Sequence, residues 1–260
     1  MPNTAVDVVI LTWNDGVLLD EAIRSVENSV GVETQIFVVD NGSTPPAEVP
    51  SHVHLIRSDT NLGVSAGRNR GIAAGKNEYV LILDSDAQLT PRALCSLMAP
   101  LIQDETIALT VPVFTDQEPE ESAGRAPTLR RKLQRARNQT NLYEAMQRSD
   151  SDPYWDVDFG IGACQLFRRS TWTAVNGIDE SFFYGPEDVD FCLRVKQQSG
   201  RVVQVQDSTV SHPPRRRFRG IATQRGIAHA WAIARFLWRH RQYDEHLPQS
   251  PDRSEAYAQQ

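Results

Sequence analysis

The chain has 260 residues, a formal net charge of −6 at pH 7, 40% hydrophobic residues and 23% charged residues. These values are typical of a globular protein with one domain and appendages, and the negative charge makes nucleic acid an unexpected partner. The three cysteines, Cys95, Cys164 and Cys192, lack the paired spacing of a disulfide framework or a zinc site. They indicate buried thiols in a reducing compartment.

The N-terminal segment 1–7 has no basic n-region and no long apolar run, so no secretory signal is expected. No stretch of the sequence approaches the ~20 apolar residues of a membrane span. The sequence therefore predicts a cytoplasmic location, with peripheral attachment at the inner face of the membrane as an open alternative.

Apolar runs and helical patterns alternate through the first third of the chain. Strands are expected over 6–12, 34–40, 53–57 and 79–83, with a helix over 17–29 and another that ends near Gly75. This alternation predicts an α/β fold with a doubly wound, mostly parallel central sheet flanked by helices. The loops that follow parallel strands gather at one edge of such a sheet, where ligands bind.

Two carboxylates follow the most apolar of these strands. Tyr79–Leu83 is a continuous apolar run, typical of a strand buried on both faces, and Asp84 and Asp86 come directly after it. Carboxylates at this edge are suited to hold a divalent cation, which in turn holds phosphates. The alternative is that both acids only begin a loop before a helix that has Thr90 as N-cap and Pro91 as its first residue.

Further polar residues are expected at the same edge. Thr12 ends the first strand, and Asp40 ends the second and begins a cluster of turn-forming residues. The segment Gly63–Gly71 has neither a dinucleotide fingerprint nor a Walker lysine. Its glycines permit close approach of the backbone, and its Arg68 is able to pair with a phosphate through two hydrogen bonds. The alternative is a glycine-eased loop with a surface arginine.

The composition changes in the middle of the chain. A helix is expected over 91–103 and a buried strand over 106–114, after which 116–125 is acidic and 128–148 is strongly charged. We expect residues 115–150 to form a helical insertion or lid over the sheet edge, because they are too few to bury a core of their own. The basic face of this insertion would meet an anionic acceptor or a lipid headgroup, or else only solvent.

A second acidic cluster follows an aromatic stretch. Phe182–Pro186 leads into a helix whose first turn holds Glu187, Asp188 and Asp190. Negative charge at a helix N-terminus is stabilising by about 0.3–1 kcal/mol per residue, which alone would explain Glu187. The aromatic and Gly-Pro approach predicts that Asp188 and Asp190 face a cavity, although Asp190 also has Arg194 four residues on as an ion-pair partner.

An extended segment near the C-terminus ends in a histidine. A strand over 201–206 and further extended chain lead to His212, which precedes Pro213 and Pro214. A lone histidine is usually structural or faces solvent, but a neutral imidazole is also a common metal ligand.

A basic run and an amphipathic helix close the chain. Arg215–Arg219 is followed by a helix expected within 218–241, whose charges are basic. We expect this helix to dock on the body, with contact to an anionic membrane surface left open. Residues 1–243 are expected to form one domain, and 244–260 a disordered tail.

Several segments together resemble the family-2 glycosyltransferases, which have the GT-A fold. The resemblance covers about Val6 to His212, and it depends on the order and separation of the segments, because no single one would suffice. Its second half is most similar to the rhamnosyltransferase-like branch. The segments are Val8–Thr12, Val38–Thr44, Asn61–Gly63, Arg68–Gly71, Leu83–Asp86, Gly162–Arg168 and Phe182–Asp190.

The resemblance implies a binding site for a UDP- or dTDP-sugar and a divalent cation, Mg²⁺ or Mn²⁺. Within it, Thr12 and Asp40 would contact the nucleoside, and Arg68 the nucleoside or the diphosphate. The full set is Thr12, Asp40, Arg68 and Asp84 for the donor nucleotide, with Asp86 and His212 for the metal ion.

On the acceptor side, the resemblance implies that Asp188 is the general base. Glu187, Asp190 and Trp155 would contact or support the acceptor, a saccharide or a lipid-linked molecule. A base on the face opposite the leaving group gives a single displacement, which inverts the anomeric configuration. The implied function is a metal-dependent inverting hexosyltransferase in bacterial polysaccharide or glycoconjugate synthesis.

The sequence also departs from that branch and leaves two other functions open. Many members have asparagine at Arg68 and Asn-Pro-Asp at Leu83–Asp86, so the sugar and the acceptor stay undetermined. A nucleotidyltransferase shares the sheet and the metal, but usually has a glycine-rich loop and a basic residue after the first strand, unlike Trp13–Gly16. A non-catalytic subunit that binds nucleotide sugars is the other alternative, against which the presence of Asp188 argues.

Overall fold

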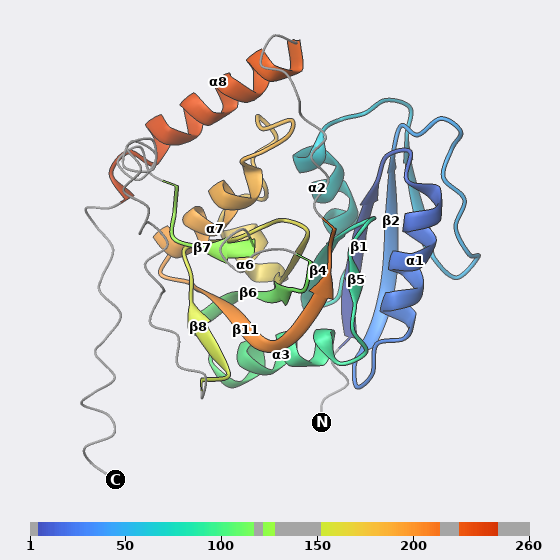
Figure 1. Ribbon diagram of the computed structural model, residues 1–260, viewed down its shortest axis with the longest axis horizontal. Helices are drawn as coiled ribbons and strands as arrows, with labels where there is room; N and C mark the ends of the chain where they lie inside the picture. The colour runs from blue at the N-terminus through green and yellow to red at the C-terminus, as the bar shows by residue number, and fades with distance from the viewer. Residues whose placement is uncertain (1–4, 117–121, 128–151, 214–223, 244–260) are drawn as a thin grey trace.

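The computed structural model describes residues 5–116, 122–127, 152–213 and 224–243 (Figure 1). Most of the helical insertion expected over 115–150, the basic run Arg215–Arg219 and the tail 244–260 lie outside the described residues. The expectation that residues 1–243 form one domain stays a prediction.

The described chain alternates strands and helices, as the apolar pattern predicts. The strands are β1 (Ala5–Thr12), β2 (Glu33–Asn41), β3 (His54–Ser58), β4 (Tyr79–Asp84), β5 (Gln88–Leu89), β6 (Ile107–Phe114), β7 (Ala123–Gly124), β8 (Tyr154–Asp156), β9 (Phe159–Gly160), β10 (Cys164–Arg168) and β11 (Arg201–Ser211). The helices are α1 (Gly16–Glu27), α2 (Val64–Ala74), α3 (Ala93–Gln103), α6 (Arg169–Ala174), α7 (Glu187–Gln197) and α8 (Gln224–Arg239).

One large sheet with the order β3-β2-β1-β4-β10-β6-β11-β5 forms the centre of the molecule, and β8 pairs with β11 beside this path. The pairs among β3, β2, β1 and β4 are parallel, as is β6 with β11. The expected α/β architecture with a mostly parallel sheet is confirmed. A purely parallel sheet is not found, because β10 runs antiparallel to both β4 and β6, and β5 and β8 run antiparallel to β11.

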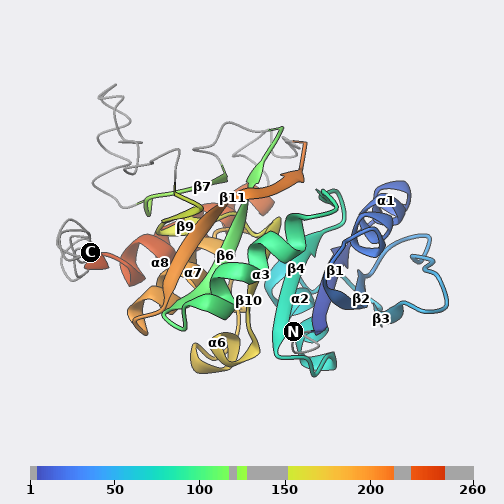
Figure 2. The same cartoon turned by 90° about the horizontal axis from the view of Figure 1, so that it is seen from below.

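Helices cover both faces of this sheet. The apolar residues that alternate along β1 point to opposite faces, so Val8 packs with α1 and α3 while Val9 packs with α2 and α7. Both side chains are fully buried, which explains why the central strands are continuously apolar. Figure 2 shows the sheet from below, with α1 at one end of the molecule and α8 at the other.

The start of α3 differs from the expected cap. Helix α3 begins at Ala93, with Arg92 at the N-cap position and no side-chain cap, so Thr90 does not cap it. The Thr90 hydroxyl instead donates a hydrogen bond of 3.0 Å to the carbonyl of Thr209 in β11. This residue therefore ties the chain after β4 to β11, a contact that helix-capping patterns do not predict.

Strand β11 curves across the sheet (Figure 1). Its pairing with β6 shifts register between Gln204 and Thr209, and beyond this irregularity it pairs with the short strand β5, Ser211 opposite Gln88. A bulge of this kind bends a strand and changes the direction of its end. As a result, the residue after β11 arrives next to the loop that follows β4.

The C-terminal helix docks on α7 through a small apolar cluster. Phe236 of α8 and Tyr243 pack with Phe182 and with Val189 and Leu193 of α7. This agrees with the expected docking of the terminal helix on the body. Among the described helices, none is both long and apolar enough to cross a lipid bilayer. The thiols of Cys164 and Cys192 are buried and free, whereas Cys95 is also free but partly exposed.

Candidate active site

Three residues that could hold a metal ion meet at the carboxyl edge of the sheet. Asp84 is the last residue of β4, Asp86 lies in the following turn, and His212 follows β11. One ligand atom from each lies within 4.8 Å of the other two. The His212 Nε2 atom is 3.4 Å from Asp86 Oδ1 and 4.0 Å from Asp84 Oδ2. The structure thus brings His212 to two carboxylates that precede it by more than 120 residues in the sequence.

Backbone pairing positions the histidine. Because Gln88 pairs with Ser211 in antiparallel register, His212 is placed opposite the turn that contains Asp86. The carboxylate of Asp116 accepts hydrogen bonds from the His212 amide at 3.1 Å and from the Ser211 hydroxyl at 2.5 Å. Asp116 therefore fixes the backbone that carries the imidazole. The sequence showed Asp116 only as the start of an acidic stretch and did not predict this role.

The donor atoms of this cluster suit a hard or borderline divalent cation. Two carboxylates and one imidazole are a common ligand set. Their ligand atoms lie within 4.8 Å of one another, which is compatible with two ligands on one ion, roughly 4–4.6 Å apart. Burial works against a charged imidazole, but the hydrogen bond to Asp86 and the charges of Asp84 and Asp86 raise the pKa of His212. An excess of negative charge therefore surrounds this histidine, as expected where a cation binds.

Arg68 lies behind this cluster and is buried in α2, with 3% of its surface exposed. One guanidinium nitrogen donates to Asp84 Oδ1 and to the carbonyl of Gly162, both at 2.7 Å. The other lies 3.3 Å from Glu187 Oε1. Arg68 is therefore not a surface arginine on a glycine-rich loop, which was the alternative interpretation of this segment. Its predicted contact with the nucleoside or diphosphate stays a prediction, since its hydrogen bonds here go to the protein.

Glu187 and Asp188 open helix α7 beside Arg68. Burial and the charge of Asp188 raise the pKa of Glu187 to about 7, although the charge of Arg68 opposes this shift. The partly exposed Asp188 accepts hydrogen bonds from the Gly162 amide at 2.9 Å and from the Val189 amide at 2.8 Å. These two donors orient the Asp188 carboxylate on the side of the cluster where α7 begins.

Gly162 connects the two halves of the site. Its amide donates to Asp188, and its carbonyl accepts from Arg68, which also holds Asp84. A Cβ atom at this position would overlap the Arg68 guanidinium, so the close approach requires a glycine. Sequence analysis noted Gly162 within a matching segment but gave it no role, because a glycine carries no side-chain signal.

Thr12 and Asp40 lie side by side at the ends of β1 and β2, where they pair in register. The Thr12 hydroxyl oxygen is buried and has no hydrogen-bond partner within the described residues. The Asp40 carboxylate accepts from the amides of Ser43 and Ala47 at 2.9 and 3.0 Å. Although burial opposes it, these hydrogen bonds and Arg57 lower the pKa of Asp40. Asp40 thus shapes the loop at this edge.

The structure does not bring Trp155 and Asp190 into this cluster. Trp155 lies on β8 opposite Gln204 of β11 and packs partly buried against the sheet. Asp190 is fully buried and forms an ion pair of 2.7 Å with Arg194, the alternative considered for it from sequence. Its other partners are Arg239 and His240, each at 2.9 Å. Their predicted acceptor roles stay predictions.

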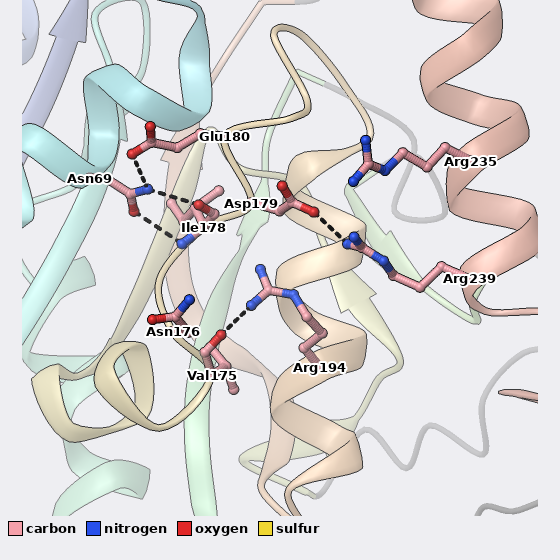
Figure 3. A pocket seen from close by; sticks show the side chains of 9 residues that line it. All are labelled: Asn69, Val175, Asn176, Ile178, Asp179, Glu180, Arg194, Arg235 and Arg239. Carbon is pink, nitrogen blue, oxygen red and sulfur yellow. Dashed lines mark hydrogen bonds and ion pairs between the residues drawn. The ribbon is translucent and has the colours of Figure 1, made fainter.

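A separate cavity of about 560 Å³ lies between α7, α8 and the segment after α6. Figure 3 shows Arg235 and Arg239 reaching into it from α8, opposite Asn69 and Glu180. None of the three cluster residues lines it. We therefore assign the chemistry to the edge of the sheet, where the acidic groups and the imidazole converge.

Comparison with known proteins identifies relatives of this chain. A sequence model described as glycosyl transferase family 2 matches residues 7–172. The pre-mycofactocin glycosyltransferase of Mycobacterium tuberculosis is 29% identical over 223 residues, which cover 82% of this chain and 44% of that protein. An N-acetylglucosaminyl-diphospho-decaprenol L-rhamnosyltransferase of the same species is 28% identical over 231 residues, 79% of this chain and 75% of that protein.

The fold also has a counterpart among solved structures. The crystal structure of GalNAc-T7 with UDP, GalNAc and Mn²⁺ matches with a TM-score of 0.68 and 17% sequence identity, covering 99% of this chain and 54% of that one. The mixed sheet flanked by helices is thus the GT-A architecture. This chain spans about half the length of several of the proteins it matches, with 44% for the pre-mycofactocin enzyme and 54% for GalNAc-T7.

Proposed function

Because this chain belongs to glycosyl transferase family 2, we propose that it transfers a sugar from a UDP- or dTDP-linked donor to an acceptor hydroxyl, with inversion of the anomeric configuration. The observation that carries the proposal is the connection between two groups of acids. Asp84, Asp86 and His212 form the cluster at the sheet edge, and Arg68 and Gly162 connect this cluster to Asp188.

The donor diphosphate binds at the cluster in this proposal. Asp86 and His212 would hold a divalent cation, with Asp84 Oδ2, which lies 4.0 Å from His212 Nε2, beside them. The cation, when bound, neutralises the negative charge of the departing nucleoside diphosphate. The hydroxyl of Thr12, which no described residue engages, is available to a nucleoside at the same edge, and Asp40 holds the loop that borders it.

Asp188 removes the proton from the acceptor hydroxyl. Its carboxylate is oriented by the amides of Gly162 and Val189 and is partly exposed, so that a lone pair remains for the acceptor. Attack by the acceptor oxygen on the face opposite the leaving group forms the new glycosidic bond while the bond to the diphosphate breaks. Glu187 supports this helix start through its contact with Arg68.

The names of the relatives support the substrate classes. The structure of GalNAc-T7 contains UDP and Mn²⁺, and the rhamnosyltransferase is named for a lipid diphosphate substrate. We extend these to a UDP- or dTDP-sugar donor and to a saccharide or lipid-linked acceptor here. Hexosyl transfer in polysaccharide or glycoconjugate synthesis is the process that such substrates would serve.

Donor binding is tested by thermal stabilisation across a panel of nucleotide sugars, each with and without Mg²⁺ or Mn²⁺. A donor at about 100 times its Kd adds about 2.7 kcal/mol of stability, or roughly 5–10 °C in melting temperature for a chain of this size. We expect this shift to require the metal and to be lost in Asp86→Asn. Equal shifts with and without metal in the parent would contradict the proposed cation site.

The role of Asp188 is tested by Asp188→Asn, which keeps the shape of the side chain but removes the base. We expect the donor-induced stabilisation to remain and transfer to fall by about 10²–10⁴-fold. Asp207→Asn, on an exposed position of β11, is the matched control and should retain the parent rate. If Asp188→Asn transfers sugar as fast as the parent, another group is the base. Donor stabilisation without any transfer or donor hydrolysis by the parent would favour a non-catalytic subunit.

A further inference from the structure

The outer face of α8 carries two large apolar side chains exposed to solvent. Trp231 is 74% exposed and Trp238 is 69% exposed. They are seven positions apart in the sequence, which is about two helical turns, so both lie on one face. The opposite side of the same helix is anchored by Phe236, which is 2% exposed and packs against α7. The tryptophans are therefore not needed to dock the helix on the body.

Basic side chains accompany the two tryptophans. The sequence of α8 contains arginines but neither aspartate nor glutamate, although the whole chain has a net charge of −6. Arg235 lines the cavity between α7 and α8 but is exposed and forms no ion pair with the described residues, whereas Arg239 pairs with Asp179. Arg241, just beyond the helix, stacks on Trp238 with its guanidinium carbon 4.7 Å from the ring centroid.

We infer that this surface, which consists of Trp231, Trp238 and Arg241, with the cavity-lining Arg235 at its edge, and is called here the α8 outer face, docks onto an anionic lipid bilayer. Tryptophan side chains prefer the boundary between headgroups and acyl chains, and arginines beside them pair with lipid phosphates. Each basic residue near an anionic membrane contributes about 1 kcal/mol. A two-fold symmetric dimer through this face is disfavoured, because the second copy would present the same positive charge to it.

The docking would place a particular side of the molecule at the membrane. Helix α8 is the outermost element at the top of Figure 1, and besides the apolar cluster around Phe236, polar contacts tie it and the residue after it to the segment around α7. His229 contacts the carbonyl of Tyr184 at 3.3 Å, and Arg239 and His240 pair with Asp190. Asp190 is two residues from Asp188. If the proposed function holds, helix α7, whose first turn carries Asp188, is then separated by α8 from the bilayer that would hold a lipid-linked acceptor.

Vesicle binding tests this inference without donor, acceptor or activity, so its outcome is independent of the proposed function. The full chain is sedimented with vesicles of phosphatidylcholine alone and with vesicles of equal parts phosphatidylcholine and phosphatidylglycerol. We expect binding to the anionic vesicles only, weakened severalfold when salt is raised from about 0.1 M to about 0.5 M. Absence of binding to anionic vesicles, or equal binding to both kinds, would overturn the inference.

Two variants locate the contact. Trp231→Ala combined with Trp238→Ala should weaken binding at least tenfold, and Arg235→Glu should weaken it by about tenfold or more. The matched controls are Ile102→Ala, an exposed apolar residue of α3 that is 53% exposed, and Arg24→Glu on the exposed side of α1. Melting temperatures establish that each variant is folded, which the exposure of these side chains leads us to expect.

Two results would assign the α8 outer face to a different occupant. Unchanged vesicle binding in both variants would place the membrane contact elsewhere. A dimer in light scattering that the double tryptophan variant converts to a monomer would identify a second copy of the chain as the occupant. Either result overturns the inference, whereas loss of binding in both variants with retention in both controls supports it.

Discussion

At the scale of single residues, the site depends on a few atoms that connect acids on different elements. Arg68 neutralises Asp84 of β4 and contacts Glu187 of α7. The charge of a buried arginine interacts strongly with both of its carboxylates. Removal of Arg68 would leave both carboxylates without this counter-charge, and removal of either carboxylate would leave Arg68 with only one. Gly162 is the residue that allows this arrangement, because its lack of a side chain makes room for the guanidinium.

Gly162→Ala tests this arrangement directly. The added methyl group would overlap the Arg68 guanidinium and force it away from Asp84, so we expect a loss of about 1–3 kcal/mol in the free energy of unfolding. Misplacement of the linked groups should also lower kcat/KM by about 10²-fold. Urea unfolding and initial-rate kinetics measure the two effects.

The matched control for this substitution is Gly16→Ala. A Cβ atom at Gly16 would meet nothing within 4 Å, so stability and activity should stay close to those of the parent. Parental kinetics in Gly162→Ala would mean that the position of Arg68 does not matter for transfer.

At the scale of elements, helix α7 is held between α8 and the carboxyl edge of the sheet, where the candidate active site lies. Its first turn contacts Arg68 and Gly162, while the buried Asp190 receives Arg239 and His240 from the C-terminal helix region. The carboxylates of the first turn therefore do more than cap the helix. Asp188 faces the site through Gly162 and Asp190 faces α8, a division that follows from the 100° rotation per residue of an α-helix, which places residues two apart on opposite sides.

The attachment of α8 should depend on pH through Asp179. Burial alone would raise the pKa of Asp179, but hydrogen bonds from Ser181 and Arg239 outweigh it and lower the pKa to about 2. A carboxyl whose pKa is lower in the folded state stabilises the fold above its unfolded pKa of 3.8, and this contribution is lost as pH falls toward 2. We expect Asp179→Asn to reduce stability by about 1–2 kcal/mol at pH 6, with the difference shrinking as pH falls.

Free energies of unfolding at pH 6 and at about pH 3 check this expectation. The Asp179→Asn substitution is repeated in an Arg239→Gln background, where most of its effect should disappear because the ion pair of 2.6 Å is already broken. A constant difference between Asp179→Asn and the parent across this pH range would contradict the assigned ion pair.

At the scale of the whole molecule, polar ties join segments that are far apart in sequence. Asp7 at the start of β1 is fully buried and accepts hydrogen bonds from Asn77 at 2.6 and 2.8 Å and from Arg169 of α6 at 2.6 Å. These contacts lie at the amino end of β1 and β4, opposite the end that holds the site. They join the parallel half of the sheet to the antiparallel strand β10 and its following helix.

Asp7→Asn should therefore destabilise the fold without changing the chemistry. The substitution leaves the Arg169 guanidinium without its buried counter-charge, so we expect the free energy of unfolding to fall by about 2–4 kcal/mol. Urea unfolding measures this loss, with Asp20→Asn at an exposed position of α1 as the control. Where the variant is folded, kcat/KM should equal that of the parent, and a large loss of kcat without loss of stability would contradict a purely structural role.

The sequence alone determined the strands β1 to β4, β6 and β11 and most helices, but not the short strands β5, β7, β8 and β9. It also located the polar residues at the ends of the strands. Periodicity and apolar runs are local properties, so Tyr79–Leu83 could be recognised as a buried strand, and Asp84 and Asp86 could be assigned to the ligand-binding edge. The matching segments also led to the family, which the sequence model of glycosyl transferase family 2 over residues 7–172 establishes.

Only the tertiary structure decided which of these residues meet. The bend in β11 brings His212 to Asp86, Arg68 turns inward to Asp84 and Gly162, and Asp190 turns to α8 and its end. The local sequence pattern also did not predict that β10 runs antiparallel to β4. The physical reason is that spacing along the chain sets the face on which a side chain lies, whereas its partners depend on long-range packing of elements that are distant in sequence.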